Sequence, residues 1–310
     1  MCSSVVEHFT DNEEAEGSIP STPTNRTFKR KEGSKMPTRK RIRVVLKFGT
    51  ETLVGKFGKA KRKLDQKIFD NVARQVAFLR REQRADVVIV SSGAIKAGKE
   101  MMARSGINPN NTTLDKGQIA AVGMPYLLTR WRLAFWSSKM LTAPFWVTYS
   151  NWLFEPERRS ICSGILCCSH QGIIPIVNEN DVVSANEIEL MEKGISENDQ
   201  LALMVASLID ADAVLFLTDV GGVYEADPKV KPSARMYEEI DPETARKVYH
   251  LLSYSSSNGT GGIRAKIRSA LQCFASGRRV AIAGLDDNVI VDFARGKPVG
   301  TMIGQSAKFK

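Results

Sequence analysis

Two lysines in this chain stand beside glycines, where an ammonium group calls for an anionic partner. Lys47 follows a short apolar run and precedes Gly49, at which the backbone can approach a ligand closely. Lys266 ends the segment Gly259-Thr-Gly-Gly-Ile-Arg-Ala-Lys, whose glycines can expose backbone N–H groups at the start of a helix. This combination is typical of sites that bind phosphate.

Either lysine taken alone has a simpler interpretation as an exposed charge, and only the pair favours phosphate chemistry. Common nucleotide-binding motifs do not account for them. The chain has no GxxxxGK[ST] segment, and Arg264 takes the place of the last glycine in a GxGxxG motif. The HRD and DFG motifs of protein kinases are also missing. Phosphoryl transfer would therefore need another architecture.

The elements that would position these residues alternate between strand and helix. Unbroken apolar runs indicate buried strands, and apolar residues at helical spacing indicate helices. We expect strands at 42–48, 86–90, 173–177, 213–217 and 279–284, and helices at 65–79, 116–128, 198–209 and 261–276. Because continuous apolar strands are buried on both faces, helices must lie above and below them. The expected fold class is α/β, a sandwich with a mainly parallel central sheet.

Polar residues cluster where these expected strands end. Such clusters occur at 47–50, 91–94, 178–181 and 218–222. Open α/β sheets bind ligands at the carboxyl ends of their strands, so these four segments can converge on one crevice. Their convergence is the main argument from the residues alone that the chain is an enzyme.

Seven segments in order carry a more specific resemblance. They are Val45-Leu-Lys-Phe-Gly-Thr, Val90-Ser-Ser-Gly-Ala-Ile, Gly117-Gln-Ile-Ala-Ala-Val-Gly, Pro175-Ile-Val-Asn-Glu-Asn-Asp, Glu197-Asn-Asp-Gln-Leu-Ala, Leu217-Thr-Asp-Val-Gly-Gly-Val-Tyr-Glu-Ala-Asp-Pro and Gly259-Thr-Gly-Gly. Together they resemble the glutamate 5-kinases of the amino-acid kinase superfamily, over about residues 41–126 and 171–304. The resemblance implies a three-layer α/β/α fold.

The resemblance also implies roles for particular residues. Lys47 and Lys266 would bracket the transferred phosphoryl group, and Asp199 would orient both lysines. The positions that match glutamate-binding residues are Ser92, Gly93, Asp181 and Asn198. The positions that match the ATP-binding residues are Lys47, Gly49, Thr218, Asp219, Thr260, Gly261, Gly262, Ile263, Arg264, Ala265 and Lys266.

The implied reaction is the ATP-dependent phosphorylation of the side-chain carboxylate of glutamate, the first step of proline biosynthesis. A glutamate side chain has a pKa of about 4.3, so the nucleophile is already an anion at neutral pH and no general base is needed. Mg²⁺ would arrive with ATP, held by phosphate oxygens and water, so no metal-binding residues are expected. The family resemblance further implies a homo-oligomer and feedback inhibition by proline.

One stretch departs from the family pattern. Between Met124 and His170, family members carry an Asn-Ala-Arg-Asn-Thr-like segment, whereas this chain has the sequence that begins Glu157-Arg-Arg-Ser-Ile-Cys. The same stretch holds all four tryptophans, Trp131, Trp136, Trp146 and Trp152. Divergence and a reading-frame error both explain such a stretch. For Cys167-Cys168, buried free thiols in a helix are favoured over a redox or metal site.

The composition of the chain limits its size class, its domain organisation and its cellular setting. With 310 residues and 43% hydrophobic content, the chain can bury a large core. We expect a charged, disordered tail at residues 1–40 and a catalytic domain at residues 41–310. Five cysteines without regular spacing, together with the absence of an apolar run of about 18 residues, indicate a reducing, cytoplasmic setting away from membranes.

The net charge of +10 raises nucleic acid as a partner, but the basic clusters that begin at Arg26 and Lys56 lack interleaved aromatic residues. A nucleic-acid partner is therefore not expected. Two alternative functions stay open. One is another kinase of the same fold, such as an acetylglutamate kinase, an aspartokinase or a uridylate kinase. The other is a catalytically weak regulatory or nucleic-acid-binding relative.

Overall fold

The computed structural model describes residues 41–54, 63–83, 85–184, 197–253 and 261–304. The helices and strands all lie in one unit, residues 40–310. The tail expected at residues 1–40 lies outside the described residues, so its separation from a catalytic domain stays a prediction.

Helices and strands alternate along most of the described chain. The strands are β1 (Arg43–Phe48), β2 (Asp86–Ser91), β3 (Thr142–Val147), β4 (Ile174–Glu179), β5 (Ala213–Thr218), β6 (Glu239–Ile240), β7 (Arg279–Gly284) and β8 (Thr301–Ile303). The helices are η1 (Thr50–Leu53, a 3₁₀ turn), α1 (Gln66–Gln83), α2 (Ala94–Arg104), α3 (Lys116–Ser137), α4 (Tyr149–Leu153), α5 (Glu155–His170), α6 (Asp181–Ser184), α7 (Glu197–Leu208), α8 (Pro242–Ser253), α9 (Gly261–Ala275) and α10 (Val289–Ala294).

All of these strands form one sheet in the order β3-β4-β2-β1-β5-β7-β8-β6. The six strands from β3 to β7 in this order run parallel to one another, and β8 is antiparallel to β7. β1 lies in the interior of the sheet between β2 and β5. Consequently, the carboxyl ends of β1, β2, β4 and β5 meet at one edge, as the sequence predicts.

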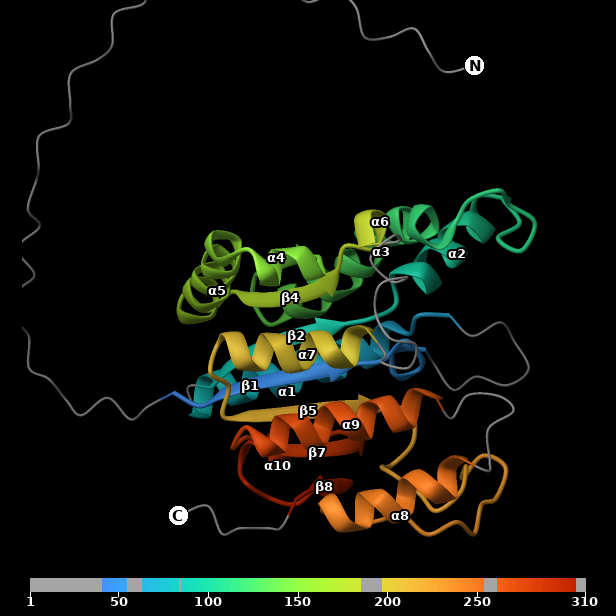
Figure 1. The fold of residues 1–310 in the computed structure, drawn as a ribbon. Coiled ribbons are helices and arrows are strands. Elements are labelled where there is room, and N and C mark those ends of the chain that lie inside the picture. The colour runs from blue at the N-terminus through green and yellow to red at the C-terminus, as the bar shows by residue number, and fades with distance from the viewer. Residues whose placement is uncertain (1–40, 55–62, 84, 185–196, 254–260, 305–310) are drawn as a thin grey trace, which may run out of the picture. The chain divides into compact units, whose positions relative to one another are not determined.

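Successive residues of a strand point to opposite faces of the sheet, and both faces are covered here. On β1, Val44 and Leu46 pack into a core with α1, α3 and α10, whereas Val45 packs into a second core with α5, α7 and α9. Figure 1 shows α7 and α9 in front of the sheet and α1 behind it. The expected α/β/α sandwich with a mainly parallel sheet is confirmed.

The stretch that departs from the family pattern folds into regular elements. α3 runs to Ser137, nine residues beyond its expected end at Leu128, and β3 is an additional edge strand that the sequence did not predict. Trp131 is fully buried and Trp152 is buried, whereas Trp136 on the same helix as Trp131 is 69% exposed. The departure in sequence therefore leaves the layered fold intact.

The described cysteines are all free. Cys167 and Cys168 lie in a helix, α5, as expected, but the expectation that they are buried is wrong. Cys167 is exposed and Cys168 is half-buried, because α5 buries a narrow stripe that includes Ile165 and Ser169, one turn apart. The adjacent thiols lie beside this stripe rather than in it.

Glycines bring α2 and α3 into close contact. A Cβ atom on Gly98 would lie 1.9 Å from the carbonyl oxygen of Ile119, and one on Gly123 would lie 1.9 Å from that of Ala94. Any larger residue would force the two backbones apart. Gly123, the last residue of the Gly117-Gln-Ile-Ala-Ala-Val-Gly segment, is therefore required for packing. The close contact that it allows holds α2, the helix that begins after β2, against α3.

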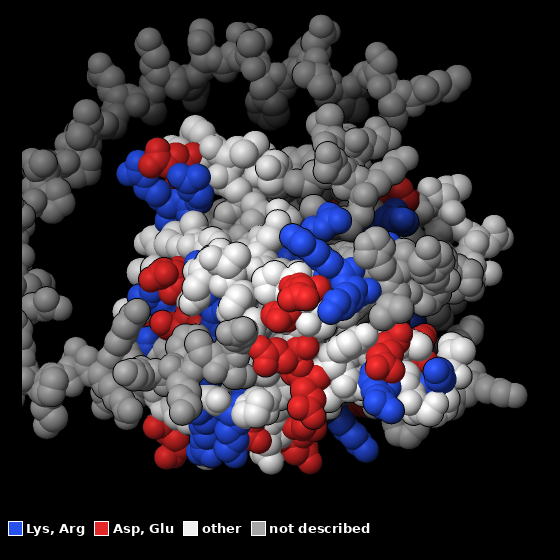
Figure 2. All heavy atoms as spheres, turned by 60° about the horizontal axis from the view of Figure 1, so that its bottom comes forward, with Lys and Arg blue, Asp and Glu red and all other residues white. Residues whose placement is uncertain are grey.

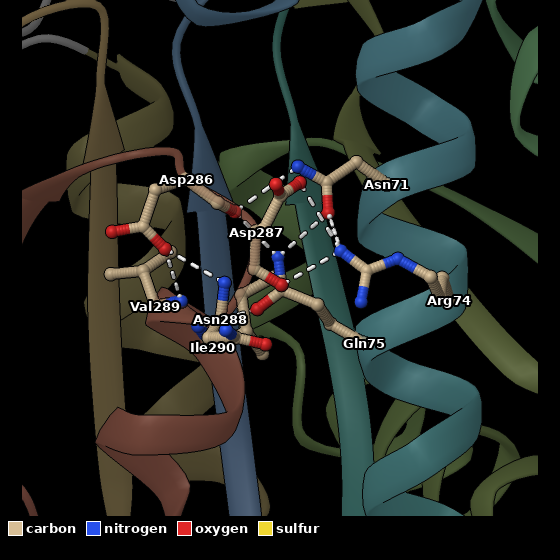
Figure 3. A network of polar contacts seen from close by, with 8 residues as sticks. All are labelled: Asn71, Arg74, Gln75, Asp286, Asp287, Asn288, Val289 and Ile290. Carbon is tan, nitrogen blue, oxygen red and sulfur yellow. Dashed lines mark hydrogen bonds and ion pairs between the residues drawn. The ribbon is translucent and has the colours of Figure 1, made fainter.

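A polar network joins α1 to the loop before α10 (Figure 3). Gln75 is fully buried, and its amide donates to the carbonyl oxygen of Asp286 at 2.8 Å while accepting from the N–H of Ile290 at 2.9 Å. Arg74 on the adjacent, exposed position donates to the carbonyl oxygen of Asp287 at 2.7 Å. These bonds attach α10 to the layer behind the sheet.

Basic and acidic groups are mixed on the face that Figure 2 shows, where the edge of the sheet formed by β8 and β6 comes forward. Clusters of Lys and Arg alternate there with clusters of Asp and Glu. The described residues of this face therefore form no continuous basic surface of the kind that typically binds nucleic acid. Among the described helices, none is long and apolar enough to cross a membrane.

Because Gln75 is buried and Arg74 is exposed, we expect substitutions at these two positions of the network to change the stability of the protein by different amounts. Gln75→Leu keeps the side-chain volume but leaves the N–H of Ile290 without its partner, so we expect the free energy of unfolding to fall by about 2 kcal/mol. Arg74→Leu, at the exposed end of the same network, should change it by less than about 1 kcal/mol. Denaturant unfolding measures both, and equal losses would contradict this account.

Candidate active site

Three segments distant in sequence bring three charged side chains together. Lys47 lies near the end of β1, Asp199 in the first turn of α7, and Lys266 in the second turn of α9. The strand alternation places Lys47 on the same face as Val45, toward α7 and α9. All three side chains are buried, with Asp199 only 1% exposed.

One carboxylate serves both lysines. The Nζ atom of Lys47 lies 2.7 Å from Oδ1 of Asp199, and Nζ of Lys266 lies 3.0 Å from Oδ1 and 3.3 Å from Oδ2. The structure thus brings together the three residues that the resemblance marks as catalytic, in the arrangement expected of an orienting aspartate. Their catalytic roles stay predictions.

The cluster carries an excess positive charge in a buried place. Burial lowers the pKa of Lys47 to about 8, helped by the nearby charge of Lys266 and opposed by Asp199. Burial alone would raise the pKa of Asp199, but Lys266 and Lys47 outweigh it and hold that pKa below its usual value. Two ammonium groups with one carboxylate therefore favour a further anion, and a phosphoryl group in transfer is such an anion.

Gly49 needs no special backbone torsion, because its φ of −75° is open to any residue. The Cβ position of this residue faces two polar side chains at ordinary contact distance. A Cβ atom there would lie 3.8 Å from Nζ of Lys47 and 3.7 Å from Oγ1 of Thr52, so a longer side chain would extend toward the lysine ammonium group. A glycine leaves that space to an anionic ligand.

Ser92 and Gly93 lie at the end of β2, next to the end of β1. The N–H of Ser92 donates to the carbonyl oxygen of Phe48 at 3.0 Å, which ties the two strand ends together. Gly93 has a φ of +113°, a value that favours glycine, and immediately precedes α2. Ser92 is buried, at 9% exposure.

The other predicted substrate residues lie on neighbouring elements. Asp181 begins α6, directly after β4, and Asn198 precedes Asp199 on α7. Buried amide atoms of Asn198 (Oδ1) and Asn178 (Nδ2) have no hydrogen-bond partner among the described residues. Asn178, 1% exposed near the end of β4, belongs to the segment Pro175-Ile-Val-Asn-Glu-Asn-Asp, whose spacing alone does not indicate a role for this residue. Free amide groups of this kind are suited to a polar ligand.

The predicted ATP-binding segments lie on β5 and α9. Thr218 ends β5, and Asp219 follows it. Thr260 lies outside the described residues, whereas α9 begins at Gly261 and contains the remaining positions, Gly262, Ile263, Arg264, Ala265 and Lys266. The backbone N–H groups at the start of α9 are thus on the same helix as the buried lysine, two turns at most from it.

Sequence reasoning missed Lys229. Its ammonium group forms an ion pair with Asp219, and this pair holds the pKa of Asp219 below its usual range although burial alone would raise that pKa. Lys229 lies in the turn that follows Asp227, whose carboxylate accepts from the N–H of Lys229 at 2.9 Å. Lys229 is assigned to this loop only by a contact across ten residues of irregular chain, for which the sequence shows no helical or strand spacing.

A cavity of about 710 Å³ lies at the ends of β5 and β7, bounded by η1 and the starts of α1 and α10. Its size is in the range of small-molecule sites. Thr218 and Asp219 line it, together with Thr52, whose hydroxyl donates to the carbonyl oxygen of Leu217 at 3.0 Å. The predicted ATP-binding segment therefore borders an open space at the expected edge of the sheet.

Comparison with known proteins identifies the family. The family model described as "Amino acid kinase family" matches residues 43–284. The chain belongs to the amino acid kinase family. Membership supports kinase activity with ATP as the phosphoryl donor, and the resemblance found in the motifs is confirmed.

Individual relatives are named more narrowly. The chain is 34% identical over 265 residues to a "Glutamate 5-kinase" of Thermoanaerobacter sp. (strain X514), covering 84% of this chain and 67% of that protein. It is 36% identical over 261 residues to a "Glutamate 5-kinase" of Dehalococcoides mccartyi (strain ATCC BAA-2266 / KCTC 15142 / 195), with the same two coverages.

Solved structures share the fold at low sequence identity. UMP kinase from Bacillus anthracis superposes with a TM-score of 0.55 at 17% identity, covering 86% of this chain and 97% of that one. An isopentenyl phosphate kinase superposes with a TM-score of 0.54 at 16% identity, covering 84% and 99%. These likenesses establish the amino acid kinase fold of the chain.

The lowered pKa of Lys47 predicts a pH dependence for phosphoryl transfer in this amino acid kinase. In the predicted role of Lys47, its ammonium form would neutralise a phosphoryl oxygen, and kcat/KM reports the ionisation of the free enzyme. We therefore expect kcat/KM for ATP to fall as the pH rises through about 8. The corresponding fall in kcat should lie at higher pH, because bound phosphate oxygens raise the pKa of the lysine.

Asp199 raises the pKa of Lys47, so Asp199→Asn should move the fall in kcat/KM for ATP to lower pH. Lys297→Met, which removes a surface lysine paired with Asp292, is the matched control and should leave the profile unchanged. A wild-type kcat/KM that stays flat to about pH 10 would show that Lys47 titrates as an ordinary lysine.

Proposed function

We propose that this chain is an ATP-dependent glutamate 5-kinase. In the proposed reaction, a side-chain carboxylate oxygen of glutamate bonds to the γ-phosphorus of ATP while the bond from that phosphorus to the β–γ bridging oxygen breaks. The products are γ-glutamyl phosphate and ADP, which carries the electron pair of the broken bond. Charge and atoms balance without a proton transfer, which agrees with a site centred on lysines.

The observation that carries the proposal is the buried Lys47–Asp199–Lys266 cluster. Its geometry places two cationic groups on one carboxylate, 2.7 and 3.0 Å from the same oxygen. Negative charge spreads over the phosphoryl oxygens and the leaving oxygen during transfer, and fixed cations in a buried site stabilise that charge strongly. Asp199 holds both ammonium groups in place before the ligand binds, which reduces the reorganisation that catalysis requires.

Glutamate as the acceptor is supported by the named relatives and by the polar groups beside the cluster. Asp181 offers a carboxylate to the substrate ammonium group, and Ser92 with the positive-φ Gly93 offers donors to a substrate carboxylate. Asn198, adjacent to Asp199, has a buried amide oxygen available for the same ligand. Ser92 and Gly93 follow β2, Asp181 begins α6 and Asn198 lies on α7, so these groups belong to elements at the same edge of the sheet as the cluster.

Mg²⁺ fits this site as a companion of ATP. Among the described residues there is no group of three or more His, Cys, Asp or Glu side chains that could hold a metal ion. The only carboxylate of the cluster is engaged by two lysines. Phosphate oxygens and water would therefore supply the ligands, and the ion would neutralise part of the phosphate charge.

The resemblance to the glutamate 5-kinases also suggests where the protein acts, how it assembles and what inhibits it. As a glutamate 5-kinase, the chain would act in the cytoplasm at the first step of proline biosynthesis. We further propose that it works as a homo-oligomer and that proline inhibits it. Nucleic acid and membranes are not proposed as partners.

The direct test is trapping of the product with hydroxylamine. With glutamate, ATP and Mg²⁺, the purified protein should form γ-glutamyl hydroxamate, and Lys47→Ala or Lys266→Ala should slow its formation about 100- to 1,000-fold. Lys297→Ala serves as the matched control and should retain the wild-type rate. A folded wild type that binds ATP but forms no hydroxamate would reject the proposed function.

The role of Asp181 generates a second prediction. Asp181→Asn removes the charge offered to the substrate ammonium group, so the KM for glutamate should rise by about tenfold or more while the KM for ATP stays within about twofold. Val182→Ala, at the exposed neighbouring position, should change neither constant. Steady-state kinetics with each substrate varied in turn distinguishes these outcomes, and a rise confined to ATP would contradict the assignment.

A further inference from the structure

Trp131 is one of the largest fully buried side chains of the described chain. Its indole packs against three rings from different parts of the fold. The ring centroids of Phe48 on β1 and Phe69 on α1 lie 5.3 and 4.6 Å away in edge-on contacts, and that of Phe135 on α3 lies 6.1 Å away. Such packing fixes the indole firmly.

The polar atom of the indole is directed at the end of β2. The Nε1–H group of Trp131 donates to Oγ of Ser91 at 3.0 Å, and the Ser91 hydroxyl donates in turn to the carbonyl oxygen of Ser92 at 3.1 Å. Ser91 is fully buried, so water cannot replace either partner. The N–H of Ser92 is held separately by the carbonyl oxygen of Phe48 at 3.0 Å.

Both backbone groups of Ser92 are therefore fixed by residues that Trp131 contacts. Its carbonyl oxygen is bonded by Ser91, and its N–H is bonded by Phe48, whose ring packs on the indole. Phe48 also follows Lys47 directly in the chain. The indole of Trp131 thus supports two strand ends. One is the end of β1, which carries Lys47, and the other is the end of β2, which leads to the predicted acceptor residue Ser92.

We propose that Trp131 is a positioning residue for acceptor binding, acting through Ser91 on the loop formed by residues 91–93. This inference rests on the proposed function, because that function assigns Ser92 and Gly93 to the substrate. Trp131 itself is buried below the loop and is not a catalytic residue. A small displacement of groups that align reactants is enough to lower the rate of transfer.

The first test is Trp131→Phe, which keeps an aromatic ring in the cluster and removes the N–H donor. We expect the KM for glutamate to rise about five- to tenfold, with the KM for ATP within about twofold of the wild-type value. The matched control is Trp136→Phe on the same helix, where the side chain is 69% exposed. It should leave both constants unchanged.

Ser91→Ala removes the same link from its other side and avoids any change in the aromatic cluster. It should raise the KM for glutamate to a similar extent, and the double variant should be no worse than the more affected single variant, because both changes break one chain of bonds. Fully additive effects of the two changes would contradict a shared route through Ser91. An unchanged KM for glutamate in both single variants would overturn the positioning role and leave Trp131 with a structural role alone.

Amide hydrogen exchange provides a readout that does not depend on activity. In Trp131→Phe and in Ser91→Ala, the amide of Ser92 and that of Ala97, which donates to the carbonyl oxygen of Gly93, should exchange about tenfold faster, while amides of β5 keep their rates. Uniform acceleration across both regions, or none at all, would overturn the proposal. If the wild type phosphorylates an acceptor other than glutamate, the proposed function fails while the exchange result still decides the role of Trp131.

Discussion

The sharing of the Asp199 carboxylate between two buried lysines is the interaction on which the rest of the site depends. Neither ammonium group could stay buried without that carboxylate, because an unpaired buried charge costs several kcal/mol. The cluster forms only when β1, α7 and α9 meet at one face of the sheet. Burial, and after it the charge of Lys266, lowers the pKa of Lys47, and the excess positive charge of the cluster makes the site ready for an anion before any ligand arrives.

The layers around the cluster keep the neighbouring strand ends in place. Gly98 and Gly123 let α2 and α3 approach so closely that their backbones touch, and α2 begins directly after the loop at residues 91–93. The indole of Trp131 then connects this loop to the end of β1. Close packing on one face of the sheet and charge pairing on the other therefore both fix the positions of side chains at the same edge. An open α/β sheet can align two ligands at such an edge.

The segment that departs from the family pattern shows how tolerant this architecture is. β3 adds a strand at the edge of the sheet, paired along its length with β4, and α5 covers the adjacent face. An edge strand and a helix packed through a narrow stripe require only general apolar patterning, so their sequences can change widely. The residues of the cluster and of the strand ends, in contrast, lie in the segments that carry the resemblance to the family.

The sequence by itself determined the layered fold and the segments that meet at the site. Apolar strands, helical spacing and glycines near Lys47 and Lys266 are local patterns, and local patterns are visible in a linear chain. The tertiary structure alone decided that β3 joins the sheet, that Cys167 is exposed, that Lys229 pairs with Asp219 and that Trp131 donates to Ser91. These features depend on how segments of the chain pack against one another, and that packing sets distances and orientations that no local preference specifies.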